Sequence, residues 1–359
     1  MAVTTRPPRN GFVAFARKIY NPIGFTKGYN FVLCFIFLGA LFGFTLSRLK
    51  SMDFYGTFCS PDSQRGSSNH AAPGECFYWL QPPYTAGMIL HLVSILPASL
   101  LACVQFIPAV RYKAIKIHRI NGYVVVILAL SGTAGAFMIG RRTFGGGLDI
   151  QSAVGALGIA FVGALVISCI NIRRLQIEQH RAWMLRAWVW AGCIITNRII
   201  FYITLITPKI DTAYYAMPCD KLDWMLGGQN TTLALYPACQ AFFTGESLSQ
   251  HASVRASITD ATSSAEAAAA MNSTFGMALW LAFALHAAGI ELYLHLTPAE
   301  TERLRRVSYA RQVKAGMRHP GSAGLTADRL GDAKKWTPSP EVDAARKVSA
   351  KPVASDVDS

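Results

Sequence analysis

The stretch His180–Ile206 reads "HRAWMLRAWVWAGCIITNRIIFYITLI". From residue 184 onward it is long and apolar enough to cross a membrane, because a spanning helix needs about 20 mainly apolar residues. The stretch nevertheless begins with a His-Arg pair and carries Arg198 inside its apolar run. Ionisable side chains within a span are costly and usually face the protein interior. The stretch therefore predicts a membrane helix bundle that has polar groups inside it.

The composition of the whole chain agrees with this interpretation. Only 15% of the 359 residues are charged and 52% are hydrophobic, whereas soluble domains carry about 25% charged residues. The net charge of +14 comes from basic residues in short clusters beside apolar runs. This distribution is typical of membrane proteins. We therefore expect the lipid bilayer as a partner, and no nucleic acid.

Five further segments have the length and hydrophobicity of a span. The six predicted spans are 29–48, 85–108, 119–140, 150–170, 184–206 and 274–296. The predicted fold is all-α: a polytopic helical membrane bundle over residues 29–296, preceded by a basic segment, 1–28, and followed by a tail, 297–359. From about residue 315 the tail is rich in Pro, Gly, Ser, Lys and Asp, and we expect it to be disordered.

Basic residues near the helix ends predict the orientation of the bundle. Lys and Arg concentrate in the N-terminal segment, in loops 109–119 and 171–186, and at the start of the tail. With six spans these segments share one side, so the positive-inside rule places both termini in the cytoplasm of a plasma-membrane or endomembrane protein. Loops 49–84, 141–149 and 207–273 then lie on the opposite side. The low-complexity stretch "SITDATSSAEAAAAMNST", at residues 257–274, predicts a mobile or weakly helical segment.

Four of the eight cysteines lie in the two long non-cytoplasmic loops. They are Cys59, Cys76, Cys219 and Cys239. An even number of loop cysteines on an oxidising side favours disulfides. Three pairings exist, of which the two within-loop pairs, Cys59–Cys76 and Cys219–Cys239, are the simplest.

Two glycosylation sequons fall in the second long loop. "NTT" at Asn230 lies well inside the loop, so we expect this asparagine to be glycosylated. "NST" at Asn272 lies next to the predicted last span, and we expect it to be too close to the membrane for modification.

Small residues recur at four-residue spacing in several spans. Gly39 and Gly43 form one such pair, and Gly132, Ala136 and Gly140 form a longer series. This spacing lets helices approach closely. It predicts tight packing within the bundle, with a homodimer face as the alternative.

Polar residues within the spans fall into two layers. With a rise of ~1.5 Å per residue, His91 lies ~10 Å from the outer end of its span, Arg198 ~12 Å and His286 ~18 Å. Glu291 is the one acid well inside a span, and Arg186 and His118 are its candidate partners by depth. The cytoplasmic-side layer contains Gln105, Arg111, His118, His180, Arg181, Arg186, Glu291 and His295.

Two motifs resemble those of a known family. The first is "HLVSILPASLLACVQFIPAVRYKAIKIHRINGY", which places a histidine in the second span and a His-Arg pair at the start of the third; the second is "HRAWMLR". Together they resemble the predicted membrane proteins of domain of unknown function 2306, over about residues 85–296. The resemblance implies a multi-helix membrane fold and supplies no established reaction.

The most specific hypothesis is a haem-binding transmembrane oxidoreductase. Haem b needs two imidazole ligands from facing helices. His91 and His286 are the candidate outer pair, and His118 with His180 or His295 is the candidate inner pair.

Three other hypotheses remain open. A membrane enzyme could act on a lipid-like small molecule by acid–base chemistry, with His91, Arg198, His286 and Glu291 as the catalytic residues. A transporter could use the polar residues to line a path. A non-catalytic scaffold would use them only to fix the bundle. The sequence identifies no metal site.

Overall fold

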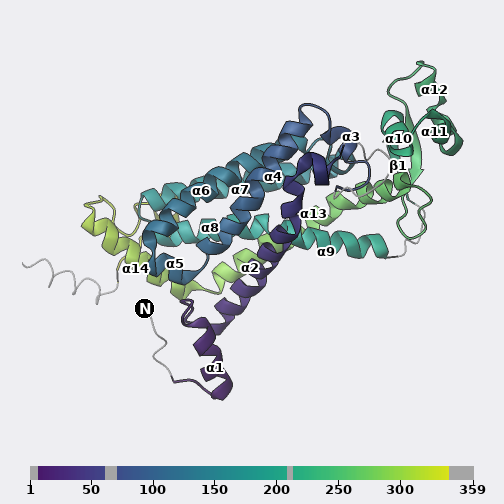
Figure 1. Ribbon diagram of the computed structural model, residues 1–359. Coiled ribbons are helices and arrows are strands. Elements are labelled where there is room, and N and C mark those ends of the chain that lie inside the picture. The colour runs from purple at the N-terminus through teal and green to yellow at the C-terminus, as the bar shows by residue number, and fades with distance from the viewer. Residues whose placement is uncertain (1–6, 61–70, 208–212, 339–359) are drawn as a thin grey trace, which may run out of the picture. The chain divides into compact units, whose positions relative to one another are not determined.

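The computed structural model describes residues 7–60, 71–207 and 213–338. The chain divides into two compact units, which are described separately. Figure 1 labels the helices and strands of the chain. Unit 1 comprises Met1–Gly158 and Gly192–Ala284, and unit 2 comprises Ile159–Ala191 and Leu285–Ser359.

The described residues contain six helices that are long and apolar enough to cross a membrane, so the six predicted spans are confirmed. The chain is an all-α, integral multi-pass membrane protein. The spanning helices are α2 (Gly28–Arg48) with its extension η1 (Leu49–Met52), α4 (Tyr84–Gln105), α6 (Ile115–Ile139), α7 (Leu148–Arg173), α8 (Ile177–Ala191) with α9 (Cys193–Ile206), and α13 (Ser264–His295). Short helices α1 (Gly11–Tyr20) and α5 (Pro108–Lys113) precede α2 and α6.

In unit 1, helices α4 and α6 pack closely through glycines. A Cβ atom on Gly135 would lie 2.6 Å from the carbonyl oxygen of Gly87, and one on Gly132 would lie 3.2 Å from Ile95. The predicted packing role of small residues in the third span is therefore confirmed. Gly39 and Gly43 in α2 differ, because a Cβ atom there would meet nothing within 4 Å.

The segment between α9 and α13 forms a small folded structure in unit 1. Strand β1 (Tyr214–Pro218) pairs in an antiparallel manner with β2 (His251–Arg255), and Pro218 lies opposite His251. Between the strands lie α10 (Cys219–Leu226), α11 (Gln229–Leu235), η4 (Pro237–Cys239) and α12 (Gln240–Phe243). The loop before α4 contains η2 (Phe54–Phe58) and α3 (Cys76–Trp79).

Both within-loop disulfides are present, which confirms the simplest of the three pairings. Cys59 bonds to Cys76, and Cys219 bonds to Cys239. The first disulfide lies in a cluster that includes Phe58 stacked on Trp79 at 5.4 Å between ring centroids. Each disulfide therefore closes a ring in a different loop of unit 1.

The alanine-rich stretch is helical from Ser264 onward, as one of the two predicted alternatives had it, and the helix is buried in the core of unit 1. Helix α13 begins at Ser264, and Ala265, Ala268 and Ala269 are fully buried. The backbone N–H of Thr262 donates to Glu266 Oε2 at 2.6 Å. Alanine has the highest helix propensity and buries little volume, so a run that reads as low complexity packs well in a crowded core.

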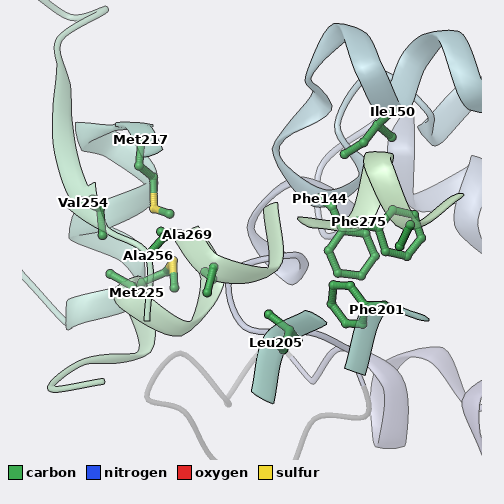
Figure 2. Packing of buried hydrophobic residues seen from close by; sticks show 14 of the residues in the cluster. Phe144, Ile150, Phe201, Leu205, Met217, Met225, Val254, Ala256, Ala269 and Phe275 are labelled. Carbon is green, nitrogen blue, oxygen red and sulfur yellow. The ribbon is translucent and has the colours of Figure 1, made fainter. Parts of the chain in front are cut away.

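The core of unit 1 contains residues of the spanning helices α7, α9 and α13 together with residues of the β hairpin. Phe144, from η3 (Thr143–Gly146), stacks on Phe275 of α13 at 3.9 Å, and both rings contact Phe201 of α9 (Figure 2). Met217 and Val254 of the hairpin belong to the same buried cluster. The hairpin is therefore part of the unit's core.

In unit 2, the tail after the last span makes defined side-chain contacts as far as Trp336, which differs from the predicted disorder after about residue 315. Gln312 of α14 (Pro298–Lys314) donates to Gln176 Oε1 at 2.9 Å and accepts from the Gly321 N–H at 2.6 Å. Arg305 pairs with Asp328 of α15 (Ala327–Leu330) at 2.6 Å. Hydrogen bonds to buried glutamines hold this polar segment, although its composition is typical of disorder. Residues 339–359 lie outside the described residues.

Candidate functional site

Three loops that were predicted to share one side of the membrane meet at a buried ion pair in unit 1. Lys221 Nζ of α10 lies 3.8 Å from Glu75 Oε1, directly before α3. The two side chains are 1% and 0% exposed. The third loop contributes Phe144, whose backbone N–H donates to Glu75 Oε2 at 2.8 Å. We call the face formed by these loops the loop side.

Both charged residues of the pair lie close in sequence to a disulfide-bonded cysteine. Glu75 directly precedes Cys76, and Lys221 follows Cys219 by two residues. Phe144 has φ +46°, in the left-handed region that bulky residues rarely adopt, and this conformation is held by its ring stacking and its bond to Glu75. The disulfides and the aromatic stack therefore assemble the pair from segments that are far apart in sequence.

Burial moves the two groups toward their neutral forms. It raises the pKa of Glu75, against the lowering effects of Lys221, the Phe144 N–H and Arg198. It also lowers the pKa of Lys221, against the raising effects of Glu75 and Asp220. Carboxyl and amine groups perturbed in this way by burial and a specific partner are candidates for acid–base roles.

A cavity of about 120 Å³ lies directly at Lys221. Its lining contains Tyr78, Arg142, Gly145, Tyr215, Ala216, Met217, Pro218, Lys221, His251 and Asn272. Lys221, Tyr78, Met217 and Asn272 are buried, whereas Arg142 and His251 are exposed, so the cavity has a buried floor and a cationic rim. Pockets for drug-sized ligands occupy roughly 300–1,000 Å³, so this cavity fits a small polar group of a larger molecule.

The Tyr78 ring contacts both the rim arginine, Arg142, and the lysine of the ion pair, Lys221. The Arg142 guanidinium lies 4.7 Å from the centroid of the Tyr78 ring, and Lys221 Nζ lies 5.4 Å from the same centroid. Arg142 Nε also contacts the Tyr84 hydroxyl at 3.4 Å. Burial raises the pKa of Tyr78, so its hydroxyl stays protonated at neutral pH. The rim cation is thus held in place by aromatic side chains.

Arg198, the charged residue inside the fifth predicted span, contacts aromatic rings in the structure. Its guanidinium carbon lies 5.0 Å from the Phe275 ring centroid and 5.7 Å from that of Phe144. The guanidinium therefore contacts the two stacked rings, one of which belongs to Phe144, the residue whose backbone N–H donates to Glu75. The neighbouring Asn197 is fully buried, and neither its amide nitrogen nor its amide oxygen has a hydrogen-bond partner.

The two membrane histidines of unit 1 lie at different heights. His91 Nδ1 lies 2.7 Å from the carbonyl oxygen of Gly132 and must donate its proton there. On the same helix as Gly132, His118 lies 132 − 118 = 14 residues away, or about 21 Å along the axis. His91 and His118 therefore belong to separate layers, as their depths predicted.

In unit 2, Glu291 forms a two-pronged ion pair with Arg186, at 2.6 and 2.8 Å. Arg186 is one of the two partners predicted from depth. The Glu291 side chain is 53% exposed, so this acid lies on the surface of the unit. His286 Nδ1 lies 2.6 Å from the Val189 carbonyl oxygen, and His180 Nδ1 lies 2.8 Å from the Ser168 hydroxyl.

Each predicted haem pair takes one histidine from each unit, so the pairs stay predictions. The first pair combines His91 of unit 1 with His286 of unit 2, and the second combines His118 of unit 1 with His180 or His295 of unit 2. Among the described residues, no group of three or more His, Cys, Asp or Glu side chains could hold a metal ion.

The sequence reasoning missed Glu75, Arg142, Lys221, His251 and Asn272. All five fall in loops of the topology predicted from the sequence, where charged and polar residues are ordinary. One available signal was position in the loops: Glu75 adjoins Cys76, and Lys221 is close to Cys219. A charge beside a disulfide cysteine is fixed in space more firmly than one in the middle of a long loop.

The two sequons differ in exposure. Asn230 is exposed on α11, whereas Asn272 is 3% exposed on α13. The side chain of Asn272 is therefore inaccessible in the folded protein. Glycosylation of Asn230 stays a prediction.

Comparison with known proteins confirms the family resemblance over part of the chain. Residues 88–218 match the model of the family described as "Predicted membrane protein (DUF2306)". The chain is also similar to "Ava biosynthesis cluster protein G" of Aspergillus versicolor, with 24% identity over 339 residues, covering 79% of this chain and 94% of the relative. No solved structure matches the chain. Arg142 and Tyr215 lie within the family match, whereas Glu75, Lys221 and Asn272 lie outside it.

Proposed function

We propose that this protein is a membrane enzyme that performs acid–base chemistry in the loop-side cavity, with Lys221 and Glu75 as the proton-transferring groups. The observation that carries the proposal is the buried 3.8 Å pair whose lysine lines the cavity. An ion pair that served only to stabilise the fold would not need to adjoin an open space. Buried lysines with a lowered pKa are suited to act as general bases.

In this mechanism the Lys221 ammonium ion, paired with Glu75 at rest, gives a proton from Nζ to the substrate. The neutral amine that forms takes a proton back from the substrate at a later step, and Glu75 stabilises the ammonium ion that is restored. The Phe144 N–H holds the Glu75 carboxylate in place through this cycle. Tyr78 and the exposed Arg142 position the polar part of the substrate at the rim.

The substrate that this site favours is an amphipathic, lipid-like small molecule. The cavity has room for only a small polar group, and the site lies at the ends of membrane helices. The name of the fungal relative assigns that protein to a biosynthesis cluster. An enzymatic step in making a small molecule agrees with that name.

Catalytic roles for His91, Arg198, His286 and Glu291 stay predictions.

In support of the haem b hypothesis, the Nδ1–H of His91 donates to a backbone carbonyl, which leaves Nε2 as the basic nitrogen of this ring. The absorption spectrum of purified protein tests it. A reducible Soret band that disappears in His91→Ala supports haem, and a protein that is colourless and takes up no haemin refutes it.

Product analysis in the source organism tests the acid–base proposal. A strain lacking the protein would be complemented with the wild type, Lys221→Met, Glu75→Gln or the control Lys50→Met, which alters an exposed lysine. We expect a metabolite that the wild type and the control restore, and that both site variants lose at equal protein abundance. Restoration by Lys221→Met to the wild-type level would refute the proposal.

A further inference from the structure

We infer that the loop-side cavity binds a carboxylate group, held between Asn272 at its floor and Arg142 at its rim. This inference rests on the proposed function and names the chemical class of the substrate. All the residues that carry it belong to unit 1.

The cavity presents hydrogen-bond donors and no acid. Its lining contains one arginine, one lysine, one asparagine and the hydroxyl groups of Tyr78 and Tyr215, but neither aspartate nor glutamate. The nearby Glu75 is occupied by Lys221 and by the Phe144 N–H. A ligand group that matches this lining must accept hydrogen bonds and carry negative charge.

Asn272 provides the independent observation. It is 3% exposed, and its Nδ2 atom has no hydrogen-bond partner. A buried donor that is left unsatisfied costs roughly 1–3 kcal/mol, so native proteins rarely keep one without a reason. A Cβ atom on Gly145, which also lines the cavity, would lie 3.0 Å from this Nδ2 and would collide with the Tyr215 hydroxyl. The absence of a side chain at Gly145 thus makes room for the Tyr215 hydroxyl and the Asn272 amide in the same part of the cavity lining.

Arg142 is suited to the other end of the ligand. The Tyr78 ring and the Tyr84 hydroxyl position its guanidinium, whose paired N–H groups match the two oxygens of a carboxylate. A carboxylate is favoured over a phosphate because the floor of the cavity is buried. A monoanion costs less to remove from water than a dianion, and one rim arginine supplies a single counter-charge.

Binding of acetate to the full-length, detergent-solubilised protein tests the inference by isothermal titration calorimetry at constant ionic strength. Acetamide has the same shape without the charge and serves as the matched ligand. We expect acetate to bind at least about tenfold more tightly than acetamide, because hydrogen bonds to charged groups are worth about 1.5–3 kcal/mol. Equal binding of the two, or tighter binding of inorganic phosphate, would overturn it.

Variants of two residues that line the cavity test whether acetate binds there. Asn272→Leu and Arg142→Gln should each weaken acetate binding about tenfold, while the neighbouring control Arg141→Gln should leave it unchanged. Acetate binding that survives both variants refutes the assignment. The measurement needs no turnover, so its failure is separate from failure of the proposed chemistry: loss of product in Lys221→Met without acetate binding would refute only the carboxylate inference.

Discussion

Replacing either member of the Glu75–Lys221 pair should destabilise the protein far more than replacing both. At a separation of 3.8 Å and an effective dielectric constant of about 20, the attraction between the full charges is about 4 kcal/mol. Removing one partner of a buried pair typically costs about 3–5 kcal/mol, because the other is left buried and uncompensated. Lys221→Met and Glu75→Gln should therefore each cost about 3–5 kcal/mol.

The double variant Glu75→Gln/Lys221→Met leaves no unpaired charge, and neutral replacement of a buried pair is often close to neutral in stability. Unit 1 spans about 250 residues, for which 1 kcal/mol corresponds to about 2–4 °C in melting temperature. Each single variant should therefore melt at least about 6 °C below the wild type, and the double variant should recover most of that loss.

The assay is thermal unfolding of the detergent-solubilised protein, followed by tryptophan fluorescence, for the wild type, both single variants and the double variant. Lys50→Met again serves as the exposed control and should melt as the wild type does. If the losses of the two single variants simply add in the double variant, the pair is not coupled and the reasoning is wrong. Single variants that melt at the wild-type temperature would show that the two charges are not buried together.

Three further predictions address other parts of the chain. The hydrogen bonds from Ser257 and Arg255 lower the pKa of Asp260, so the stability from this carboxylate should be complete above the unfolded value of about 3.8 and lost as the pH falls through the lower folded pKa; melting curves of Asp260→Asn should converge on those of the wild type in acid, and a gap that persists there would contradict this. Gly135→Ala should destabilise the protein by about 1–3 kcal/mol, because the new Cβ atom meets the backbone of α4, whereas Gly39→Ala should be neutral; equal melting temperatures for the two variants would count against the close α4–α6 packing. Expressed in a eukaryotic secretory pathway, the protein should lose a glycosidase-sensitive mass in Asn230→Gln but not in Asn272→Gln, since only Asn230 is exposed; unmodified wild-type protein would contradict the predicted orientation.

The sequence predicted those features that depend on local composition. Hydropathy located all six spans, because each is a continuous apolar run. Loop position was enough to pair Cys59 with Cys76 and Cys219 with Cys239. Depth along the helices identified Arg186 as a partner of Glu291, because antiparallel helices bring residues of equal depth together.

The candidate site could not be predicted in this way, because it depends on contacts between distant segments. Glu75 and Lys221 are separated by 146 residues in the chain (221 − 75), and no periodicity connects them. Arg198 was predicted to face the protein interior, and the structure places it against Phe275 and Phe144. The order of the alanine-rich start of α13 likewise depends on the hairpin and helices that cover it.

The positions of the two disulfides have a consequence for the maturation of the protein. Glu75 lies inside the ring closed by Cys59 and Cys76, and Lys221 lies inside the ring closed by Cys219 and Cys239. A newly inserted chain with reduced thiols therefore holds neither charge in place, and both can stay hydrated. Oxidation of the thiols closes the rings and brings the charges together. If the proposed chemistry depends on this pair, it therefore begins only after the chain has reached a compartment that oxidises cysteines.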